Sequence, residues 1–204
     1  MKIRNDLHLK QPWRVHELTG DFLLEDVWQF PIEAAPESAQ NFELFREVFK
    51  KAMEDIKDTG PAGALFRFRM WLGKLFNWDS AQSATPVFNK DSLLHRYCSG
   101  THPEGAADRD AAPAGDQGGF HPVYAIERET LSEIANKTVH AALHLSWVPL
   151  ETGQYTARLA VYVKILHPFT RWYMLLIKPF RLWIVYPTMM RRTGKLWRQA
   201  ASTA

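Results

Sequence analysis

Two alternating segments give the clearest structural pattern in the chain: TVHAALHLSWV at residues 138–148 and YTARLAVYVKI at residues 155–165. In both segments apolar side chains recur at every second position, which is the period of a β-strand that buries one face. The five residues PLETG at 149–153 lie between them and include the turn formers Pro and Gly. The sequence therefore predicts an antiparallel β-hairpin.

The two faces of the predicted hairpin differ in chemistry. One face is apolar on both strands, and we expect it to lie on the core. The other face combines His140 and His144 on the first strand with Arg158, Tyr162 and Lys164 on the second. We expect this second face either to be solvated or to line a pocket, where its polar groups would orient the polar end of an apolar ligand.

Helical periodicity accounts for much of the N-terminal half. Apolar residues recur at three- and four-residue steps over 42–56 and again over 62–76, so each range predicts a helix. A strand is predicted near 22–31, where Pro31 ends it. A short helix is predicted at 127–136.

Residues 79–119 are rich in Gly, Pro and small polar residues and predict a long, mobile loop. Within it, the apolar pairs at 87–88 and 93–94 are compatible with a short strand or a helical turn. The length of 204 residues is that of one domain, so we expect residues 1–204 to form a single α+β domain. Its antiparallel sheet would be packed by helices.

The C-terminal segment is the most apolar part of the chain. Residues 168–199 predict helix in two or three pieces, because Pro179 and Pro187 each lack a backbone donor and interrupt or kink a helix. Such a segment is either buried on two faces or partly exposed to a ligand, a partner or a membrane. Its aromatic residues lie on more than one side and include Trp172, Trp183 and Tyr186.

Charge is unevenly distributed along the chain. The net charge is +3, yet residues 152–204 hold nine Lys and Arg and no carboxylate. This polarity would attract an anionic partner such as a phospholipid surface, or would dock the segment on the acidic remainder of the chain. Positive charge is the single feature that favours nucleic-acid binding, because the sequence contains no recognised nucleic-acid-binding motif. A single cysteine excludes a disulfide framework and a cysteine-based zinc site.

The sequence shows no targeting or membrane-spanning segment. The start, MKIRND at residues 1–6, is polar and no apolar region follows it. The most apolar stretch, 172–190, is broken by Lys178, Arg181 and two prolines, whereas a spanning helix needs about 20 mainly apolar residues. We therefore expect a cytoplasmic protein that is able to touch a membrane surface.

Two groups of motifs together resemble a known family. The first is EIANKTVH at 133–140 with LHLSWV at 143–148, and the second is LAVYVK at 159–164, followed by WYM at 172–174, IKPFR at 177–181 and IVYP at 184–187. They resemble the bacterial family catalogued as domain of unknown function 2867. Its members occur alone or as the C-terminal part of sugar-epimerase-like proteins. The resemblance supplies no catalytic residues.

The resemblance also implies a fold and a type of function. The family is similar to the START-like, polyketide-cyclase superfamily, in which an antiparallel sheet wraps around a long C-terminal helix and encloses an apolar cavity. It implies a helix-grip fold and a small apolar ligand, with or without cyclase-like chemistry. The alternative is a peripheral membrane or protein-interaction module that uses the basic, aromatic C-terminal helices.

For the first function, the candidate site combines the polar hairpin face with the C-terminal aromatics. No cofactor is expected, because no Gly-rich phosphate loop is present. No metal is expected either, because His140 and His144 would lie about 13 Å apart along one strand. The sequence leaves the question of an enzyme and the oligomeric state open. The predicted ligand-binding residues are His140, His144, Arg158, Tyr162, Trp172, Trp183 and Tyr186.

Overall fold

The computed structural model describes residues 1–34, 39–58, 63, 91–100, 120–135, 139–166 and 168–202. The helix predicted at 62–76 and most of the predicted 79–119 loop lie outside these residues, apart from Gly63 and 91–100. The elements in chain order are β1 (Lys2–Ile3), α1 (Asp6–Leu9), α2 (Val15–Leu18), β2 (Leu23–Gln29), α3 (Ala39–Asp58), α5 (Leu93–Cys98), β3 (His121–Ile126), β4 (Glu129–Ala135), β5 (Val139–Pro149), β6 (Tyr155–Ile165), α6 (Pro168–Phe180), the π-helical turn η3 (Arg181–Val185) and α7 (Tyr186–Ala201).

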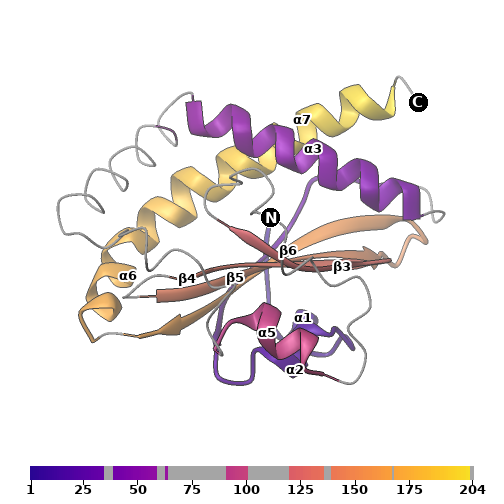
Figure 1. The fold of residues 1–204 in the computed structure, drawn as a ribbon. Helices are drawn as coiled ribbons and strands as arrows, with labels where there is room; N and C mark the ends of the chain where they lie inside the picture. The colour runs from indigo at the N-terminus through magenta and orange to yellow at the C-terminus, as the bar shows by residue number, and fades with distance from the viewer. Residues whose placement is uncertain are drawn as a thin grey trace.

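A single antiparallel sheet organises the fold, in the strand order β1-β2-β6-β5-β4-β3. The last four strands form a meander, and the N-terminal strand β2 pairs with the last strand β6. Helices cover both faces: α3 and α7 lie on one face, and the short helices α1, α2 and α5 lie on the other (Figure 1). The predicted α+β class is confirmed.

The predicted hairpin is present as β5 and β6. Its register runs from Val139 opposite Ile165 to Pro149 opposite Tyr155. Gly153 has a φ of 80° in the connecting turn, a backbone conformation that glycine adopts without a steric penalty. The predicted strand near 22–31 and the predicted helix over 42–56 are confirmed as β2 and α3.

The apolar face of the hairpin lies on the main core, beneath α3 and α7. This core is dense in aromatic rings; Phe45, for example, lies 6.0 Å from Trp147 between ring centroids. Buried side chains from the sheet, α3 and α7 fill this layer. They include Trp28, Phe30, Phe42, Phe45, Phe49, Trp147, Leu159, Val161, Tyr186, Met189, Met190 and Trp197.

The prediction for 127–136 is wrong: the segment is the strand β4, not a helix. β4 lies between β3 and β5 and hydrogen-bonds to both, so its backbone groups are satisfied by the sheet. Both faces of the strand contribute buried residues, because the consecutive residues Glu129, Thr130 and Leu131 are all buried. Buried carboxylates on the same face as Leu131 hid the alternation that identifies a strand.

The C-terminal segment is helical throughout 168–201, as predicted, and its prolines lie on either side of an irregular turn. Pro179 is inside α6, near its end, and Pro187 is in the first turn of α7. The π-helical turn η3 connects the two helices. Such turns accommodate a backbone carbonyl that a proline leaves without its helical donor. No helix within the described part of the chain is long and apolar enough to cross a membrane.

Candidate functional site

Two buried glutamate–histidine pairs join β4 to β5. The Nε2 atom of His144 lies 2.6 Å from Oε2 of Glu129, and Nε2 of His140 lies 2.6 Å from Oε2 of Glu133. In the sheet register Glu129 is opposite Ser146 and Glu133 is opposite Ala142, so each carboxylate reaches diagonally to a histidine two positions away. All four side chains are buried.

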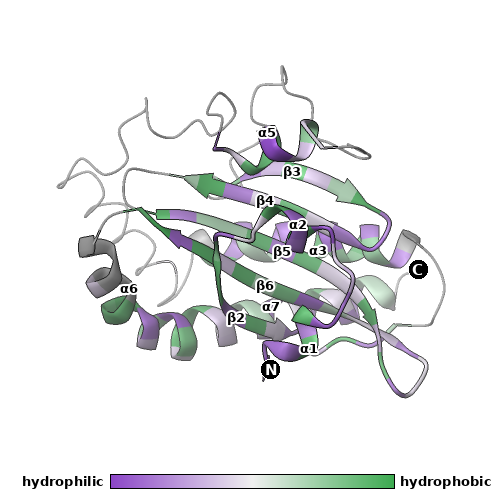
Figure 2. Ribbon diagram, turned by 90° about the horizontal axis from the view of Figure 1, so that it is seen from below, coloured by the Kyte–Doolittle hydropathy of each residue, from purple (hydrophilic) through white to green (hydrophobic). Residues whose placement is uncertain are grey.

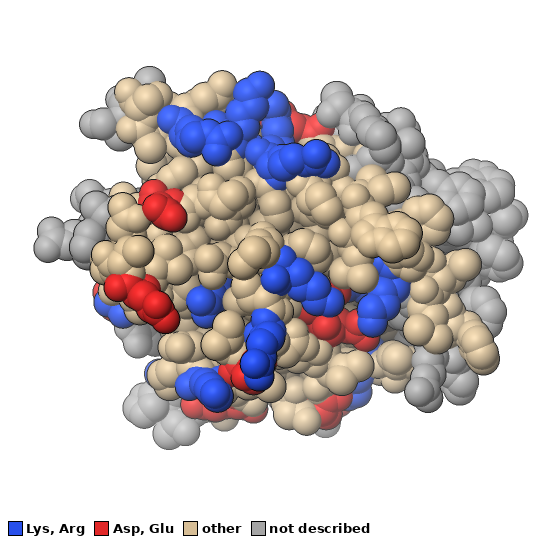
Figure 3. Space-filling view, turned by 180° about the vertical axis from the view of Figure 1, so that it is seen from behind, with Lys and Arg blue, Asp and Glu red and all other residues tan. Residues whose placement is uncertain are grey.

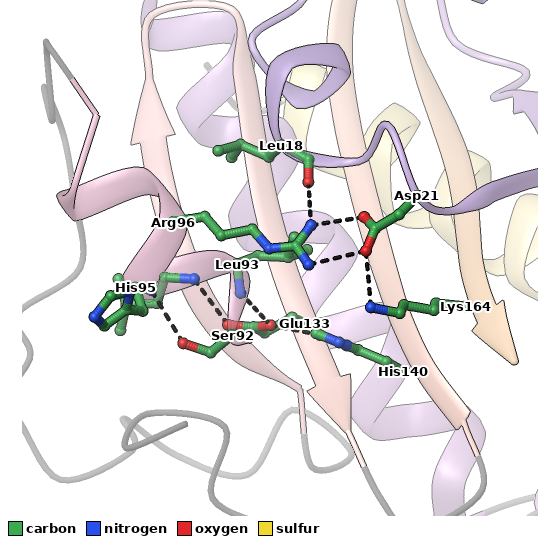
Figure 4. A network of polar contacts seen from close by, with 10 residues as sticks. Leu18, Asp21, Ser92, Leu93, His95, Arg96, Glu133, His140 and Lys164 are labelled. Carbon is green, nitrogen blue, oxygen red and sulfur yellow. Dashed lines mark hydrogen bonds and ion pairs between the residues drawn. The ribbon is translucent and has the colours of Figure 1, made fainter. Parts of the chain in front are cut away.

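The Glu133–His140 pair holds α5 on the sheet (Figure 4). The two carboxylate oxygens of Glu133 accept the backbone amides of Leu93 at 2.8 Å and Leu94 at 3.0 Å, at the start of α5. These amides have no partner inside the helix, and an anion stabilises them. Because the helix amides and His140 occupy both oxygens, this pair has a structural role.

A second set of contacts in the same view joins α5 to Asp21, which precedes β2, and to Lys164 on β6 (Figure 4). Arg96 donates two hydrogen bonds to the carboxylate of Asp21, at 2.6 and 2.9 Å, and a third to the carbonyl of Leu18. The Nζ atom of Lys164 lies 2.7 Å from the same carboxylate. These contacts, led by the hydrogen bond from Arg96, hold the pKa of Asp21 well below its usual range.

The Glu129–His144 pair makes different contacts. Glu129 accepts further hydrogen bonds from the backbone amide of Arg14 at 3.0 Å and from the hydroxyl of Tyr124 at 2.8 Å. Burial by itself would raise the pKa of Glu129, but His144 and these donors hold it below its ordinary value. Burial lowers the pKa of His144, against the opposing effect of Glu129. The pair is therefore a carboxylate beside a neutral imidazole.

These protonation states decide which nitrogen of His144 is free. Nε2 carries the proton, because it faces a carboxylate that only accepts. Nδ1 consequently has a lone pair, and it is buried without a hydrogen-bond partner among the described residues. An imidazole that is oriented by a carboxylate and has a free nitrogen can accept a proton or a hydrogen bond from a bound hydroxyl group.

Two further histidines from the N-terminal segment, His8 and His16, lie near the His144 ring. The His8 ring packs against His144 at 5.1 Å and against His16 at 5.3 Å between centroids. The hydroxyl of Tyr162 lies 3.0 Å from Nε2 of His8 and 3.2 Å from Nδ1 of His16, so it joins the two rings. We name the group His8, Trp13, His16, Glu129, His144 and Tyr162 the histidine cluster.

The histidine cluster and the neighbouring Ser146 contain buried polar atoms that lack partners among the described residues. Native proteins leave few such atoms, and each one needs an explanation. Within the described ranges no group of three His, Cys, Asp or Glu side chains is placed to hold a metal ion. The atoms therefore suit a hydrogen-bonding ligand. They are Nδ1 of His8, Nε1 of Trp13, Nε2 of His16, Nδ1 of His144 and Oγ of Ser146, the residue opposite Glu129.

The polar residues predicted for the site lie on one face of the sheet. His144 and Tyr162 belong to the histidine cluster, whereas His140 is engaged by Glu133. Arg158 lies on the same face, where its Nε is 3.3 Å from Oε1 of Gln29. This face is not the solvated surface that one interpretation expected, because α1, α2 and α5 cover it (Figures 1 and 2). His144 is completely buried.

The structure does not bring the predicted C-terminal aromatics to these residues. Tyr186 lies in the core on the opposite face, 4.8 Å from Trp28 between ring centroids, and its hydroxyl accepts a hydrogen bond from Arg181. Trp172 and Trp183 are 73% and 78% exposed. The sheet separates Tyr186 from the histidines, so the seven predicted residues do not line one cavity.

The sequence contained a signal for part of the cluster that the helix prediction concealed. Glu129 and Glu133 are four residues apart, as are His140 and His144 on the next strand. With 127–136 assigned as a strand, the antiparallel arrangement would have matched each glutamate to a histidine. His8 and His16 carried no periodic signal, because tertiary packing alone brings the N-terminal segment to β5 and β6.

Comparison with known proteins places the chain in a family without assigning an activity. No curated protein matches the chain, and no solved structure does. Residues 18–188 match the family model described as "Protein of unknown function (DUF2867)", a range that contains His144, Glu129 and Tyr162 but begins after His8 and His16. The chain thus belongs to the family of proteins of unknown function DUF2867.

Proposed function

We propose that this protein binds a small molecule at the histidine cluster, between the sheet and the N-terminal helices. The observation that carries the proposal is the set of five buried polar atoms without protein partners in the described chain, which come from His8, Trp13, His16, His144 and Ser146. A ligand with a hydroxyl or carbonyl group would satisfy several of them at once.

The surroundings of the cluster favour a neutral and largely apolar ligand. Trp13 and Tyr162 supply aromatic surface, and Val15, Val27 and Leu131 supply aliphatic surface in the same buried layer. Glu129 already has three donors, and His8 and His144 are neutral because burial lowers their pKa values. An ionised ligand would therefore find no free counter-charge within the histidine cluster itself.

Access to the cluster requires the N-terminal segment to move, because the unpartnered atoms are sealed from solvent. α1 and α2 have four residues each, and helices this short contribute little stability of their own. β1 anchors the start of the chain by pairing with β2. The helices after it are held by separate long-range bonds, such as that from Nδ2 of Asn5 to the carbonyl of Leu24 and that from the amide of Arg14 to Glu129. Opening of residues 5–20, with β1 still paired, supplies the route.

The START-like relationship remains part of this proposal, in a modified form. An antiparallel sheet with a long C-terminal helix packed on it supports the relationship. In that plan the cavity lies between the sheet and the C-terminal helix, but here the aromatic core fills that layer. We therefore assign the ligand to the opposite face, where polar atoms are left to be satisfied.

Phenol and toluene form a matched pair of probes for this site. Both are flat apolar rings, and only phenol has a hydroxyl group. We expect phenol to shift the ring resonances of His8 and His144 in a saturable manner and toluene to bind more weakly. Ser146→Ala and His144→Phe should reduce the preference for phenol, whereas His95→Gln, on the exposed side of α5, should not. Shifts that do not saturate, or equal binding of both probes, would refute the proposal.

Native mass spectrometry of the gently purified protein provides the second test. A stoichiometric copurified molecule would identify the ligand class directly. Its loss in His144→Phe, with an unchanged circular dichroism spectrum, would place it at the histidine cluster. A copurified molecule that remains bound in His144→Phe and Ser146→Ala would assign the ligand to another part of the protein.

A further inference from the structure

The helix α6 and the turn η3 leave an apolar face without a partner in the described structure. None of the described side chains of α6 is buried, although the helix is rich in apolar residues. In the view from below, α6 is visible beyond the edge of the sheet, whereas α3 and α7 lie behind it (Figure 2). The exposed apolar side chains recur at three- and four-residue steps and are Trp172, Leu175, Leu176, Phe180 and Trp183.

The preceding residues extend this face. Ile165 and Leu166, at the end of β6, are also among the large apolar side chains that are exposed. Seven exposed large apolar side chains within one segment of the chain are uncommon on a monomer and indicate a site of interaction. We name Ile165, Leu166, Trp172, Leu175, Leu176, Phe180 and Trp183 the aromatic face.

Basic residues follow the aromatic face along the same helical segment. Arg191, Lys195 and Arg198 are exposed on α7 at four- and three-residue steps. None of these three takes part in an ion pair with another described residue, in contrast to Arg192, which pairs with Asp55. Seen from behind, the molecule shows a broad uncharged area between groups of Lys and Arg side chains (Figure 3).

The combination determines what kind of partner fits. An apolar protein surface would match the apolar side chains but not the unpaired cations that follow them on α7. An anionic lipid surface matches both, because aromatic rings lie at the level of the headgroups while Lys and Arg interact with anionic headgroups. Residues 152–204 contain no carboxylate that would be repelled.

We infer that the aromatic face and the basic side of α7 dock this protein on anionic membrane surfaces. Trp172, Leu176 and Trp183 insert at the headgroup boundary, and Arg191, Lys195 and Arg198 contact the lipid anions. The protein lies on the membrane and does not cross it. This inference is independent of the small-molecule site, which lies on the other side of the sheet.

Vesicle sedimentation tests the inference with the full chain. We expect binding to phosphatidylcholine vesicles that contain phosphatidylserine, and much weaker binding to vesicles of phosphatidylcholine alone. Added salt should weaken the binding, because it screens charges at an exposed surface. Brominated phosphatidylcholine should quench part of the tryptophan fluorescence, and this quenching should be lost in the double variant Trp172→Ala/Trp183→Ala.

Two sets of variants separate the apolar and the electrostatic contributions. Trp172→Ala/Trp183→Ala should weaken vesicle binding at least about tenfold, since withdrawing one large side chain from an apolar environment costs enough for a factor of ten. Arg191→Gln/Lys195→Gln/Arg198→Gln should reduce the salt dependence. The matched controls are Leu9→Ala and Lys10→Gln at the end of α1, which are exposed and lie on the face of the sheet opposite α7; both should bind as the unmodified protein does.

Three outcomes would overturn the inference. The first is no binding to phosphatidylserine vesicles, and the second is binding that the tryptophan variants leave unchanged. The third is a dimer in solution that dissociates in Trp172→Ala/Trp183→Ala without any vesicle binding, which would show that the aromatic face joins two copies of the chain. Thermal melts of each variant establish that the fold is intact.

Discussion

The imidazole of His144 donates through Nε2 to Glu129 across 2.6 Å, and both side chains are buried. This contact connects the sheet to the N-terminal segment, because Glu129 also accepts the amide of Arg14. It fixes His144 as the Nε2–H tautomer. The other ring nitrogen, Nδ1, is consequently the basic one.

The tautomer of His144 is directly measurable by nitrogen NMR. We expect a protonated Nε2 and an unprotonated Nδ1 at neutral pH. Glu129→Ala should destabilise the protein by about 3 kcal/mol or more, because it leaves three donors at a buried site, on His144, Tyr124 and the amide of Arg14, without an acceptor. Glu127→Gln is the matched control, since Glu127 is exposed and precedes Glu129 by two residues. An Nδ1–H tautomer in the unmodified protein would contradict the assigned hydrogen bond.

Acid should destabilise the fold through the histidine cluster. Burial is the largest cause and, together with the proximity of His144, His16 and Arg158, lowers the pKa of His8 from 6.5 to about 2. Between these values the unfolded chain binds more protons than the folded chain, so the free energy of unfolding falls as the pH falls below 6.5. Within this range, His8 alone lowers the free energy of unfolding by up to about 1.4 kcal/mol for each pH unit.

Two other groups of the cluster act in the same direction. Burial also lowers the pKa of His144, and Glu129 loses stabilising charge below its unfolded value of 4.5. Urea unfolding at about pH 7.5 and about pH 5 measures the effect. We expect His8→Leu to flatten the dependence and His95→Gln, which alters an exposed histidine, to leave it unchanged. If the free energy of unfolding instead increases as the pH is lowered from about 7 to about 5, the histidines are charged in the folded protein.

The sequence predicted the hairpin and α3 because each buries one apolar face with a regular period. It missed β4 because Glu129 and Glu133 are buried on the same face as Leu131, and a glutamate in a sequence suggests an exposed position. It found His144 and Tyr162 but not the partners that explain them. Those partners lie far away in the chain, as the 154-residue separation of His8 and Tyr162 shows.

The position of α5 should depend on Glu133 more than on its own capping residue. Glu133 accepts the amides of Leu93 and Leu94 while it also accepts from His140, whereas Ser92 accepts only the amide of His95. We expect Glu133→Gln to cost about 2 kcal/mol or more, since hydrogen bonds to charged groups are strong. Ser92→Ala should cost about 1 kcal/mol.

Amide hydrogen exchange distinguishes these two changes. In Glu133→Gln the amides of Leu93 and Leu94 should lose protection together, because the side-chain amide of glutamine presents only one acceptor oxygen to two donors. In Ser92→Ala the exchange of His95 should increase while that of Leu93 and Leu94 does not. Equal effects of both substitutions on Leu93 would mean that α5 is held by its apolar contacts with the sheet.

The helix α7 lies very close to the segment that follows β2. Gly194 is buried, and a Cβ atom added to it would lie 2.9 Å from Cγ of Pro31 and 3.4 Å from the Pro31 carbonyl oxygen. Alanine favours a helix over glycine by about 1 kcal/mol, but overpacking against a rigid ring costs about 1–3 kcal/mol. We expect Gly194→Ala to lower the free energy of unfolding by about 1 kcal/mol.

Gly20→Ala is the matched control for this substitution. A Cβ atom at Gly20 would meet no heavy atom within 4 Å, and Gly153 is the residue with a positive φ among the described glycines. We therefore expect Gly20→Ala to be neutral or stabilising by about 0.4–1 kcal/mol, through the unfolded chain. If Gly194→Ala proves as stable as Gly20→Ala in urea unfolding, α7 is able to shift away from Pro31. The packing of the aromatic core beneath α7 would then not hold the helix in one fixed position.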